Sequence, residues 1–166
     1  LDDLDLNPLL VQADPGKNLR YSKDKHINEV PDTLDEKIWS EIKNKIKTDS
    51  ENKFNYEIEN TSRSVGTRLS HHIYKKFGNN KLKENTVQIK LEGSAGQSLG
   101  AFLTKGIKLT VEGDCNDYVG KGLSGGTIVV YPSQKSSLVS SENTIIGNTV
   151  LYGATSGKLF ASGQAG

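Results

Sequence analysis

The sequence predicts a mainly β fold, a β-helix solenoid, preceded by a small α-helical segment with two helices. Fourteen of the 17 glycines lie in residues 93–166, so the demands on the backbone change near residue 90. Short apolar runs alternate there with glycine-rich bends at a spacing of roughly 20 residues, which is typical of solenoids whose coils bury their apolar faces by stacking. No helical periodicity separates these runs, which argues against alternating strands and helices.

The first helix is expected soon after an extended, lightly structured lead-in over residues 1–31. Thr33 and Glu36 form a capping-box pattern, and the four-residue apolar spacing behind it predicts a helix from Leu34 to Lys47. Residues 54–59 alternate between apolar and polar side chains, as a half-buried strand does.

The second helix is expected to begin near Asn60 or Thr61, either of which can cap it. Its apolar stripe is Val65, Leu69, Ile73 and Phe77, and Gly78 ends it. We therefore predict a lead-in segment with two helices and a short strand over residues 1–85, followed by the β-helix over residues 86–166.

The second half is predicted to be short strands that bend at glycines. The apolar runs are Val87–Leu91, Ile107–Val111, Thr127–Tyr131, Ile145–Ile146 and Val150–Tyr152. Glycine at the bends permits positive φ and a close approach of the next coil. The structural glycines are Gly93, Gly96, Gly100, Gly113, Gly120, Gly122, Gly125, Gly126, Gly147, Gly153 and Gly157. A β-sandwich or barrel with glycine turns remains the alternative fold.

Composition argues against several classes of function. The net charge of +1 gives no electrostatic reason to expect nucleic acid or an anionic membrane as a partner. The single cysteine, Cys115, cannot build a disulfide framework within the chain, an iron–sulfur site or a structural zinc site. No apolar stretch approaches the length of a membrane-spanning helix.

One motif suggests nucleotide binding. Gly120–Gly125 matches G-x-G-x-x-G, which binds a pyrophosphate when it opens a helix. The residues that follow, through Tyr131, read as a strand, so we interpret the motif as a tight bend between coils. No Ser or Thr follows Gly120-Lys121, so the motif is not a phosphate-binding Walker loop either.

The histidines give weak signals for a site. His71 and His72 are adjacent on the second predicted helix, where neighbouring side chains point in different directions and cannot share one metal. A solvated or interface role is the better reading for this pair, and His26 stands alone.

An acidic cluster surrounds the cysteine. Asp114, Asn116 and Asp117 could in principle do acid–base work or bind a hard cation, but these residue types also stabilise turns, which this position requires. Cys115 is interpreted as a packing residue because no histidine lies near it in sequence. Ser98, Ser124 and Ser156 lie among glycines without forming a nucleophile elbow. We therefore predict no catalytic, cofactor-binding or metal-binding residue.

A family resemblance rests on blocks that run in order along nearly the whole chain. They are Leu6–Leu10, Asn60–Gly66, Leu69–Ser70, Gly93–Phe102, Glu112–Asp114, Asn116–Gly126, Ile145–Asn148 and Leu151–Gly157. Together they resemble the C-terminal glycine-rich (GXGXG) domain of glutamate synthase large subunits, with the segment that leads into it.

This resemblance implies a right-handed β-helix that is structural and non-catalytic. It implies a parent oxidoreductase that assimilates nitrogen by converting glutamine and 2-oxoglutarate into two glutamates, using FMN and an iron–sulfur cluster. The domain would pack against the amidotransferase, central and flavin domains of that parent. The electron donor would be ferredoxin or NAD(P)H, and the compartment the cytoplasm or a plastid. The parent's cysteines and flavin site have no counterparts here, so the chain alone is expected to be inactive.

Two other functions remain open. A free-standing binding or assembly module, similar to the glycine-rich β-helix component of formylmethanofuran dehydrogenases, would share the same pattern. The helical first half and the Asn60–Gly66 block favour glutamate synthase over it. A free-standing enzyme would have to use Asp114, Asp117 and Cys115.

The chain reads as an internal piece of a longer protein. It contains no methionine, begins at Leu1, and stops inside the glycine pattern at Gly166. We expect the last coil to be uncapped, so that it pairs with another molecule or lowers stability.

Overall fold

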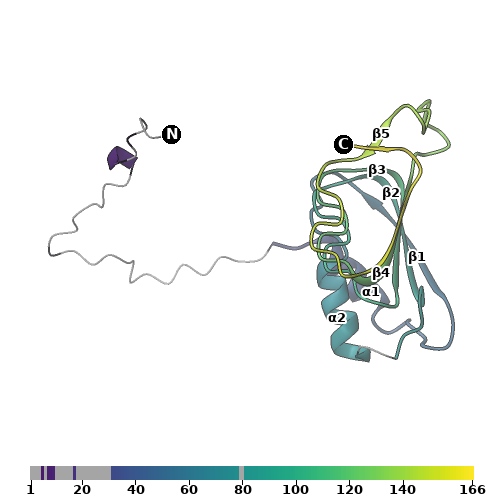
Figure 1. The fold of residues 1–166 in the computed structure, drawn as a ribbon. Coiled ribbons are helices and arrows are strands. Elements are labelled where there is room, and N and C mark those ends of the chain that lie inside the picture. Colours follow the sequence, from purple (N-terminus) through teal and green to yellow (C-terminus); the bar gives the residue numbers. More distant parts are fainter. Residues whose placement is uncertain (1–4, 6, 10–16, 18–30, 79–80) are drawn as a thin grey trace. The chain divides into compact units, whose positions relative to one another are not determined.

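The computed structural model describes residues 5, 7–9, 17, 31–78 and 81–166. The chain divides into two units, Leu1–Pro31 and Asp32–Gly166. In the first, a short 3-10 helix, η1, spans Asn7–Leu9. Most of the expected extended lead-in, including His26, lies outside the described residues. The following account concerns the second unit, whose elements are labelled in Figure 1.

Helix α1 spans Leu34–Ile42 and begins as predicted, because the Thr33 side chain accepts a hydrogen bond from the Glu36 N–H. The prediction that it continues to Lys47 is wrong. The Asn52 side chain accepts the Lys47 N–H at 2.8 Å and donates to the Lys47 carbonyl at 2.7 Å. This contact holds the Lys47 backbone against the start of the next strand, so it cannot continue the helix.

Helix α2 spans Thr67–Phe77 and ends at Gly78, as predicted. Its predicted beginning at Asn60 or Thr61 is wrong. The N-cap is Gly66, at a φ of 103°, and it makes no side-chain cap. The first N–H groups of this helix therefore need an acceptor other than a local capping side chain.

Within the described residues the structure has seven strands, β1 before α2 and the others after it, and every pairing between them is parallel. They are β1 (Asn52–Ile58), β2 (Val87–Ala95), β3 (Ile107–Cys115), β4 (Ser124–Tyr131), β5 (Thr144–Ile146), β6 (Ser156–Ala161) and β7 (Gln164–Ala165). The order across the sheet is β1-β2-β3-β4-β6, and β5 pairs with β3 and β7. Parallel pairing argues against the alternative β-sandwich or barrel with glycine turns, because tight turns join antiparallel strands.

The register confirms the predicted spacing of roughly 20 residues between β2 and β3 and between β3 and β4. Gly93 pairs with Gly113, twenty positions later, and Ile58 pairs with Gly93 on the other side. Residues 96–106 and 116–123 connect β2 to β3 and β3 to β4 without a helix. Figure 1 shows these connections as a stack of narrow coils directly above α2.

One predicted strand is wrong. Val150–Tyr152 forms turns, and the strand of that coil comes later, at Ser156–Ala161. Leu151 and Tyr152 are 38% and 64% exposed. The apolar run was interpreted as a strand because hydrophobicity usually marks burial, which it does not do here.

The core lies between the strands and the two helices. Alternate side chains of β2, β3 and β4 point inward and are almost fully buried: Ile89, Leu91, Leu109, Val111, Ile128 and Val130. Ile38 and Ile42 of α1 join the same cluster, together with Leu69 and Ile73 of α2. Burial of this apolar surface is the main stabilising contribution to the fold.

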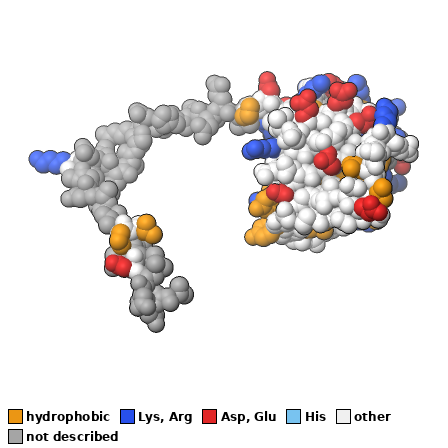
Figure 2. Space-filling model, turned by 90° about the horizontal axis from the view of Figure 1, so that it is seen from above, with side chains coloured by type: hydrophobic (Ala, Val, Ile, Leu, Met, Phe, Trp, Pro, Cys, Tyr) orange, Lys and Arg blue, Asp and Glu red, His pale blue; other side chains and the backbone are white. Residues whose placement is uncertain are grey.

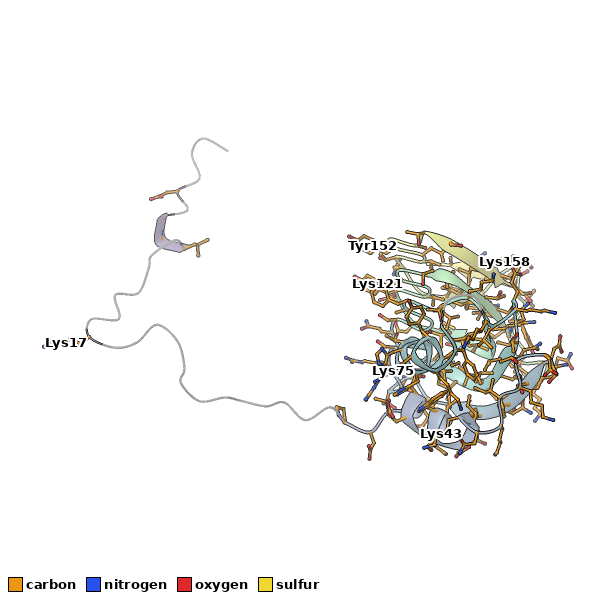
Figure 3. The ribbon with its side chains drawn as sticks, turned by 90° about the horizontal axis from the view of Figure 1, so that it is seen from below. Lys17, Lys43, Lys75, Lys121, Tyr152 and Lys158 are labelled. Carbon is orange, nitrogen blue, oxygen red and sulfur yellow. The ribbon has the colours of Figure 1, made fainter. Side chains whose placement is uncertain are left out.

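The outer surface is mixed in charge. On the face in Figure 2, acidic and basic side chains are spread among polar ones, and hydrophobic side chains gather at one edge. Figure 3 shows Lys43, Lys75, Lys121 and Lys158 on the outside of the domain. Among the residues that the structure describes, no helix is long and apolar enough to cross a membrane.

Candidate functional site

Two glycines, Gly93 and Gly113, stack in register along the sheet where a neighbouring backbone leaves no room for a side chain. A Cβ added at Gly113, whose φ is 153°, would lie 2.0 Å from the Gly93 carbonyl oxygen. One added at Gly93, with φ of 128°, would lie 2.2 Å from the Ile58 carbonyl oxygen. No side chain fits such contacts with backbone, so these positions require glycine for space as well as for conformation.

The coils at the edge of the sheet form a second repeated structure, which we call the turn stack: residues 98–102, 118–122 and 149–153. Every second residue in each segment has positive φ: Ser98, Gly100, Phe102, Tyr118, Gly120, Gly122, Thr149, Leu151 and Gly153. Backbone hydrogen bonds join each segment to the next. The Ser98 N–H donates to the Asp117 carbonyl, and the Leu151 N–H donates to the Val119 carbonyl, both at 2.8 Å.

The G-x-G-x-x-G motif lies in this turn stack. The Gly120 N–H donates to the Leu99 carbonyl and the Gly122 N–H donates to the Tyr152 carbonyl, each at 2.8 Å. The Lys121 N–H donates to the Tyr118 carbonyl at 3.1 Å. These N–H groups would have to bind a pyrophosphate, but they are already used within the stack, and strand β4 follows instead of a helix.

The two histidines have different surroundings. His72 stacks on Trp39 of α1, with ring centroids 5.1 Å apart, while its Nε2 lies 2.9 Å from a Glu36 carboxylate oxygen. The Arg68 Nε lies 2.9 Å from the same oxygen. The hydrogen bond to His72 lowers the pKa of Glu36, ahead of the charges of His72 and Arg68. His71 makes an edge-on contact with the His72 ring and takes no part in the contacts with Glu36.

The contacts between His72, Trp39, Glu36 and Arg68 join α1 to α2. Of these residues, the sequence analysis considered only His72 as a candidate site residue. Glu36 was read as part of a cap, and Arg68 and Trp39 were not connected with it, because the contacts span more than thirty positions. Among the residues that the structure describes, no group of three or more His, Cys, Asp and Glu side chains is placed to hold a metal ion.

The acidic cluster is divided between two turns. The Asn116 side chain accepts the Asp117 N–H at 2.9 Å, and the Asp117 carboxylate accepts the Asn148 N–H at 2.8 Å. The first is the local backbone contact that an Asx residue makes in a turn, and the second joins that turn to the next coil, 31 positions later. Asp114 points elsewhere, into a shallow pocket.

Cys115 lies at the end of β3 and is only 6% exposed. Burial, and to a lesser extent the nearby charge of Asp114, raises the pKa of its thiol to about 12. The thiol is therefore protonated at neutral pH, whereas a nucleophilic cysteine reacts as the thiolate. This environment suits a packing residue.

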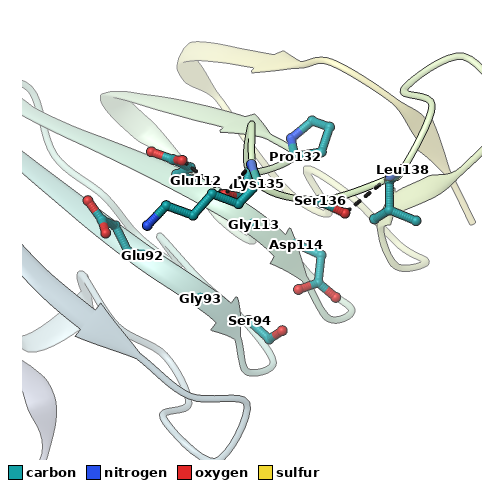
Figure 4. Close-up of a pocket in the computed structure, with 11 residues that line it drawn as sticks. Glu92, Gly93, Ser94, Glu112, Gly113, Asp114, Pro132, Lys135, Ser136 and Leu138 are labelled. Carbon is teal, nitrogen blue, oxygen red and sulfur yellow. Dashed lines mark hydrogen bonds between the residues drawn. The ribbon is translucent and has the colours of Figure 1, made fainter.

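The pocket in Figure 4 contains the carboxylates of Glu92, Glu112 and Asp114 at the ends of β2 and β3. The loop after β4 covers it, and Lys135 extends along it toward Glu92. Outside the pocket lining, the Lys90 ammonium lies 2.9 Å from Glu92 and 2.7 Å from Glu112.

That ion pair decides what the pocket can do chemically. Its hydrogen bond lowers the pKa of Glu112 and raises that of Lys90, so both groups stay charged near neutral pH. A general acid or base needs a pKa near the working pH, and these shifts move both groups away from it. Neither Glu112 nor Lys90 therefore has a pKa suited to proton transfer near neutral pH.

Sequence reasoning missed one buried carboxylate altogether. Asp35 is 2% exposed. Its carboxylate accepts the N–H groups of Gly66, Arg68 and Leu69 at 2.7, 2.8 and 3.1 Å. Burial raises the pKa of Asp35, and the three hydrogen bonds oppose that rise. Asp35 thus supplies from α1 the cap that Gly66 cannot provide for α2.

The structure is a repeat of parallel strands with glycines stacked in register. The polar side chains described above form hydrogen bonds in turns, a helix cap and ion pairs. The family model described as "GXGXG motif" matches residues 35–166. The chain belongs to this GXGXG family.

Three curated relatives show the relationship. The chain is 58% identical over 166 residues to the glutamate synthase [NADPH] large chain of Azospirillum brasilense, covering 100% of this chain and 11% of that one. It is 45% identical to glutamate synthase [NADH] of Saccharomyces cerevisiae, covering 99% and 8%. It is 42% identical to ferredoxin-dependent glutamate synthase 2 of Synechocystis, covering 99% and 11%. The chain thus spans about a tenth of the length of the relatives it matches.

Proposed function

We propose that this chain is a structural, non-catalytic domain of a glutamate synthase, which converts glutamine and 2-oxoglutarate into two glutamates. The observation that carries the proposal is the match of the whole chain to a small part of much longer glutamate synthase chains. The matched relatives are named for NADPH, NADH and ferredoxin. A domain common to enzymes with different electron donors suits a role in architecture better than one in electron delivery.

The finer architecture that we propose is a right-handed β-helix. Parallel strands offset by twenty positions, joined by turns without helices, support a coil. A crossover between parallel strands of one sheet is almost always right-handed, because the strands themselves twist that way. Such a coil is a rigid spacer, and we propose that it packs against the amidotransferase, central and flavin domains of its parent.

The parent's proposed cofactors, FMN and an iron–sulfur cluster, do not fit this chain. A cluster needs several thiolates, and the only cysteine in the sequence is buried with its pKa raised to about 12. The glycine motif that could cradle a flavin phosphate uses its N–H groups within the turn stack. We therefore place both cofactors in other parts of the parent.

The proposal is tested by turnover of the full-length parent. Asp114→Asn and His71→Gln remove the exposed groups most suited to chemistry, and we expect turnover to stay within about twofold of the unmodified enzyme. Gly113→Ala disturbs only the coil, and we expect it to lower thermal stability and turnover together. A large loss of turnover with unchanged stability in Asp114→Asn would restore a chemical role for the domain.

The alternative is a free-standing β-helix module for binding or assembly, like the formylmethanofuran dehydrogenase component. The mass of the native polypeptide that contains this sequence distinguishes the two. A chain many times the 18.1 kDa of this one supports the glutamate synthase proposal. A native chain of about that mass supports the module.

A further inference from the structure

Large apolar side chains gather on the outside of the turn stack. Phe102 is 54% exposed, Tyr118 37%, Leu151 38% and Tyr152 64%. We call these four residues the aromatic face. They come from the three successive segments of one stack, so the face is continuous along it. Figure 2 shows hydrophobic side chains gathered at that side of the domain.

At three of these positions the backbone has a left-handed conformation that is unfavourable for a bulky side chain. Phe102, Tyr118 and Leu151 have φ of 55°, 63° and 59°, in the left-handed region where a bulky side chain is strained. Glycine fills the matching place in neighbouring segments: Gly122 corresponds to Phe102, and Gly120 to Leu151. A glycine would thus satisfy the turn at lower conformational cost.

Packing within the domain accounts for only part of these side chains. The Phe102 ring covers Gly122, where an added Cβ would lie 2.5 Å from it, and Leu151 covers Gly120 at 2.8 Å. The rest of each side chain faces outward. Strained backbone combined with exposed apolar surface indicates a purpose outside the domain, because neither feature stabilises it alone.

The charge around the aromatic face is positive. The Lys121 ammonium lies 5.8 Å from the centre of the Tyr118 ring. Helix α2 packs directly against the stack, with the Thr67 hydroxyl donating to the Ala101 carbonyl at 2.9 Å. Helix α2 carries Lys75 and Lys76 in its last turn and no acidic residue, while its Arg68 and His72 contact Glu36 of α1. Figure 3 shows Tyr152, Lys121 and Lys75 projecting from the same side.

We infer that the aromatic face is the surface by which this domain docks onto another domain of its parent polypeptide, and that the docked surface is apolar with carboxylates opposite Lys121 and α2. The inference rests on the proposed function, since the chain spans about a tenth of its relatives and the remaining chain supplies the partner. Aromatic anchors with neighbouring cations are the composition of interface centres.

Hydroxyl-radical footprinting of the full-length parent tests the face. We expect labelling of Phe102, Tyr118 and Tyr152 to be several-fold lower than their exposure in this domain predicts. Leu138 and Val139, which are 47% and 51% exposed in the loop after β4, serve as internal references. A labelled aromatic face beside protection elsewhere on the domain would overturn the inference and leave the spacer function intact. Uniform labelling of all exposed residues would contradict both.

Variants of the full-length parent give a second test. Phe102→Asn combined with Tyr152→Asn removes apolar surface, and Asn tolerates positive φ at position 102. We expect Tyr118 labelling to rise several-fold, while Cys115 stays protected from alkylation and so reports an intact coil. Leu138→Asn combined with Val139→Asn is the matched control and should leave Tyr118 labelling unchanged. Unchanged Tyr118 labelling in the first variant would overturn the inference.

The predicted charge of the partner has its own readout. A zero-length carbodiimide cross-link from Lys121 to an Asp or Glu outside this sequence is expected in the full-length protein. Lys121→Arg keeps the charge but removes the amine, so the cross-link should disappear. Cross-links from Lys121 only to residues within this domain would contradict an acidic partner.

Discussion

At the scale of single residues, Gly113 leaves no room for a side chain between neighbouring strands. At Gly113 an added Cβ would lie 2.0 Å from the Gly93 carbonyl oxygen, which is backbone and cannot rotate away. We predict that Gly113→Ala lowers the free energy of unfolding by about 3 kcal/mol, through overpacking and strain at positive φ. Urea denaturation followed by circular dichroism measures the loss.

Gly153→Ala is the matched control for that substitution. Gly153 also has positive φ, at 67°, but an added Cβ would meet nothing within 4 Å. We expect a loss of only about 1 kcal/mol there, the cost of a left-handed alanine. Equal losses at the two positions would show that conformation alone, and not contact between coils, requires glycine at Gly113.

Cys115 gives a prediction about pH. Burial raises the pKa of its thiol from 9.0 to about 12. Because the folded pKa lies above the unfolded one, the contribution to stability is full below about pH 9 and is lost as pH rises toward 12. We expect stability to fall over that window and Cys115→Ser to flatten the fall.

Alkylation provides the direct measurement for the thiol. At pH 8 the native chain should react with iodoacetamide far more slowly than the chain unfolded in urea. Equal rates in the two states would mean that Cys115 is accessible in the native chain, against its 6% exposure.

At the scale of elements, the glycine spacing and alternating apolar residues were enough to predict β2, β3, β4 and the spacing of roughly 20 residues between them. They succeeded because those side chains are both apolar and buried, as the pattern assumes. Val150–Tyr152 broke that assumption. Its Leu151 and Tyr152 side chains are apolar but exposed, so the strand was placed several residues too early. The misplaced strand includes Leu151 and Tyr152 of the aromatic face. We infer that these residues are apolar because they contact a docked domain, and not because they form the core.

The start of α2 could not be predicted for a different reason. Its cap, Asp35, lies 31 to 34 positions away and was hidden inside another helix's first turn. Local cap signals at Asn60 and Thr61 therefore pointed to the wrong place. The candidate site was also predicted only in part. The sequence identified His72 and Asp117 as polar residues of interest, but the partners of His72, Asp117 and Lys90 come from distant parts of the chain.

Asp35→Ala tests this remote cap. The substitution leaves three N–H groups of α2 without their acceptor, and at least two of them are buried. We predict a loss of about 3 kcal/mol in the free energy of unfolding, which combines a lost cap with unsatisfied buried donors. Asp32→Ala, at an exposed position just before α1, is the control and should change stability by less than about 0.5 kcal/mol. A small effect at Asp35 would mean that water replaces the carboxylate.

At the scale of the whole domain, its two ends are unlike. At one end α1 reaches β1, with the Tyr56 hydroxyl 3.0 Å from a Glu41 carboxylate oxygen. At the other, β6 pairs with β4, and within the described part of the chain no strand pairs with its free edge. Leu159 on β6 is only partly buried, whereas its register partner Ile128 on β4 is fully buried, and Phe160 beside Leu159 is 56% exposed. An open, apolar strand edge is a template for another strand.

We predict that the 166-residue chain, taken alone, self-associates through β6. Sedimentation velocity over a range of concentrations should show a monomer–oligomer equilibrium, and the melting temperature should rise with concentration because association stabilises the folded state. Phe160→Lys places a charge on the edge strand and should shift the equilibrium to monomer. Val139→Lys, on an exposed loop residue, should not. A monomer at every concentration with a high melting temperature would mean that the strand edge is protected by its own twist and short length, and the coil would then need no neighbour at that end.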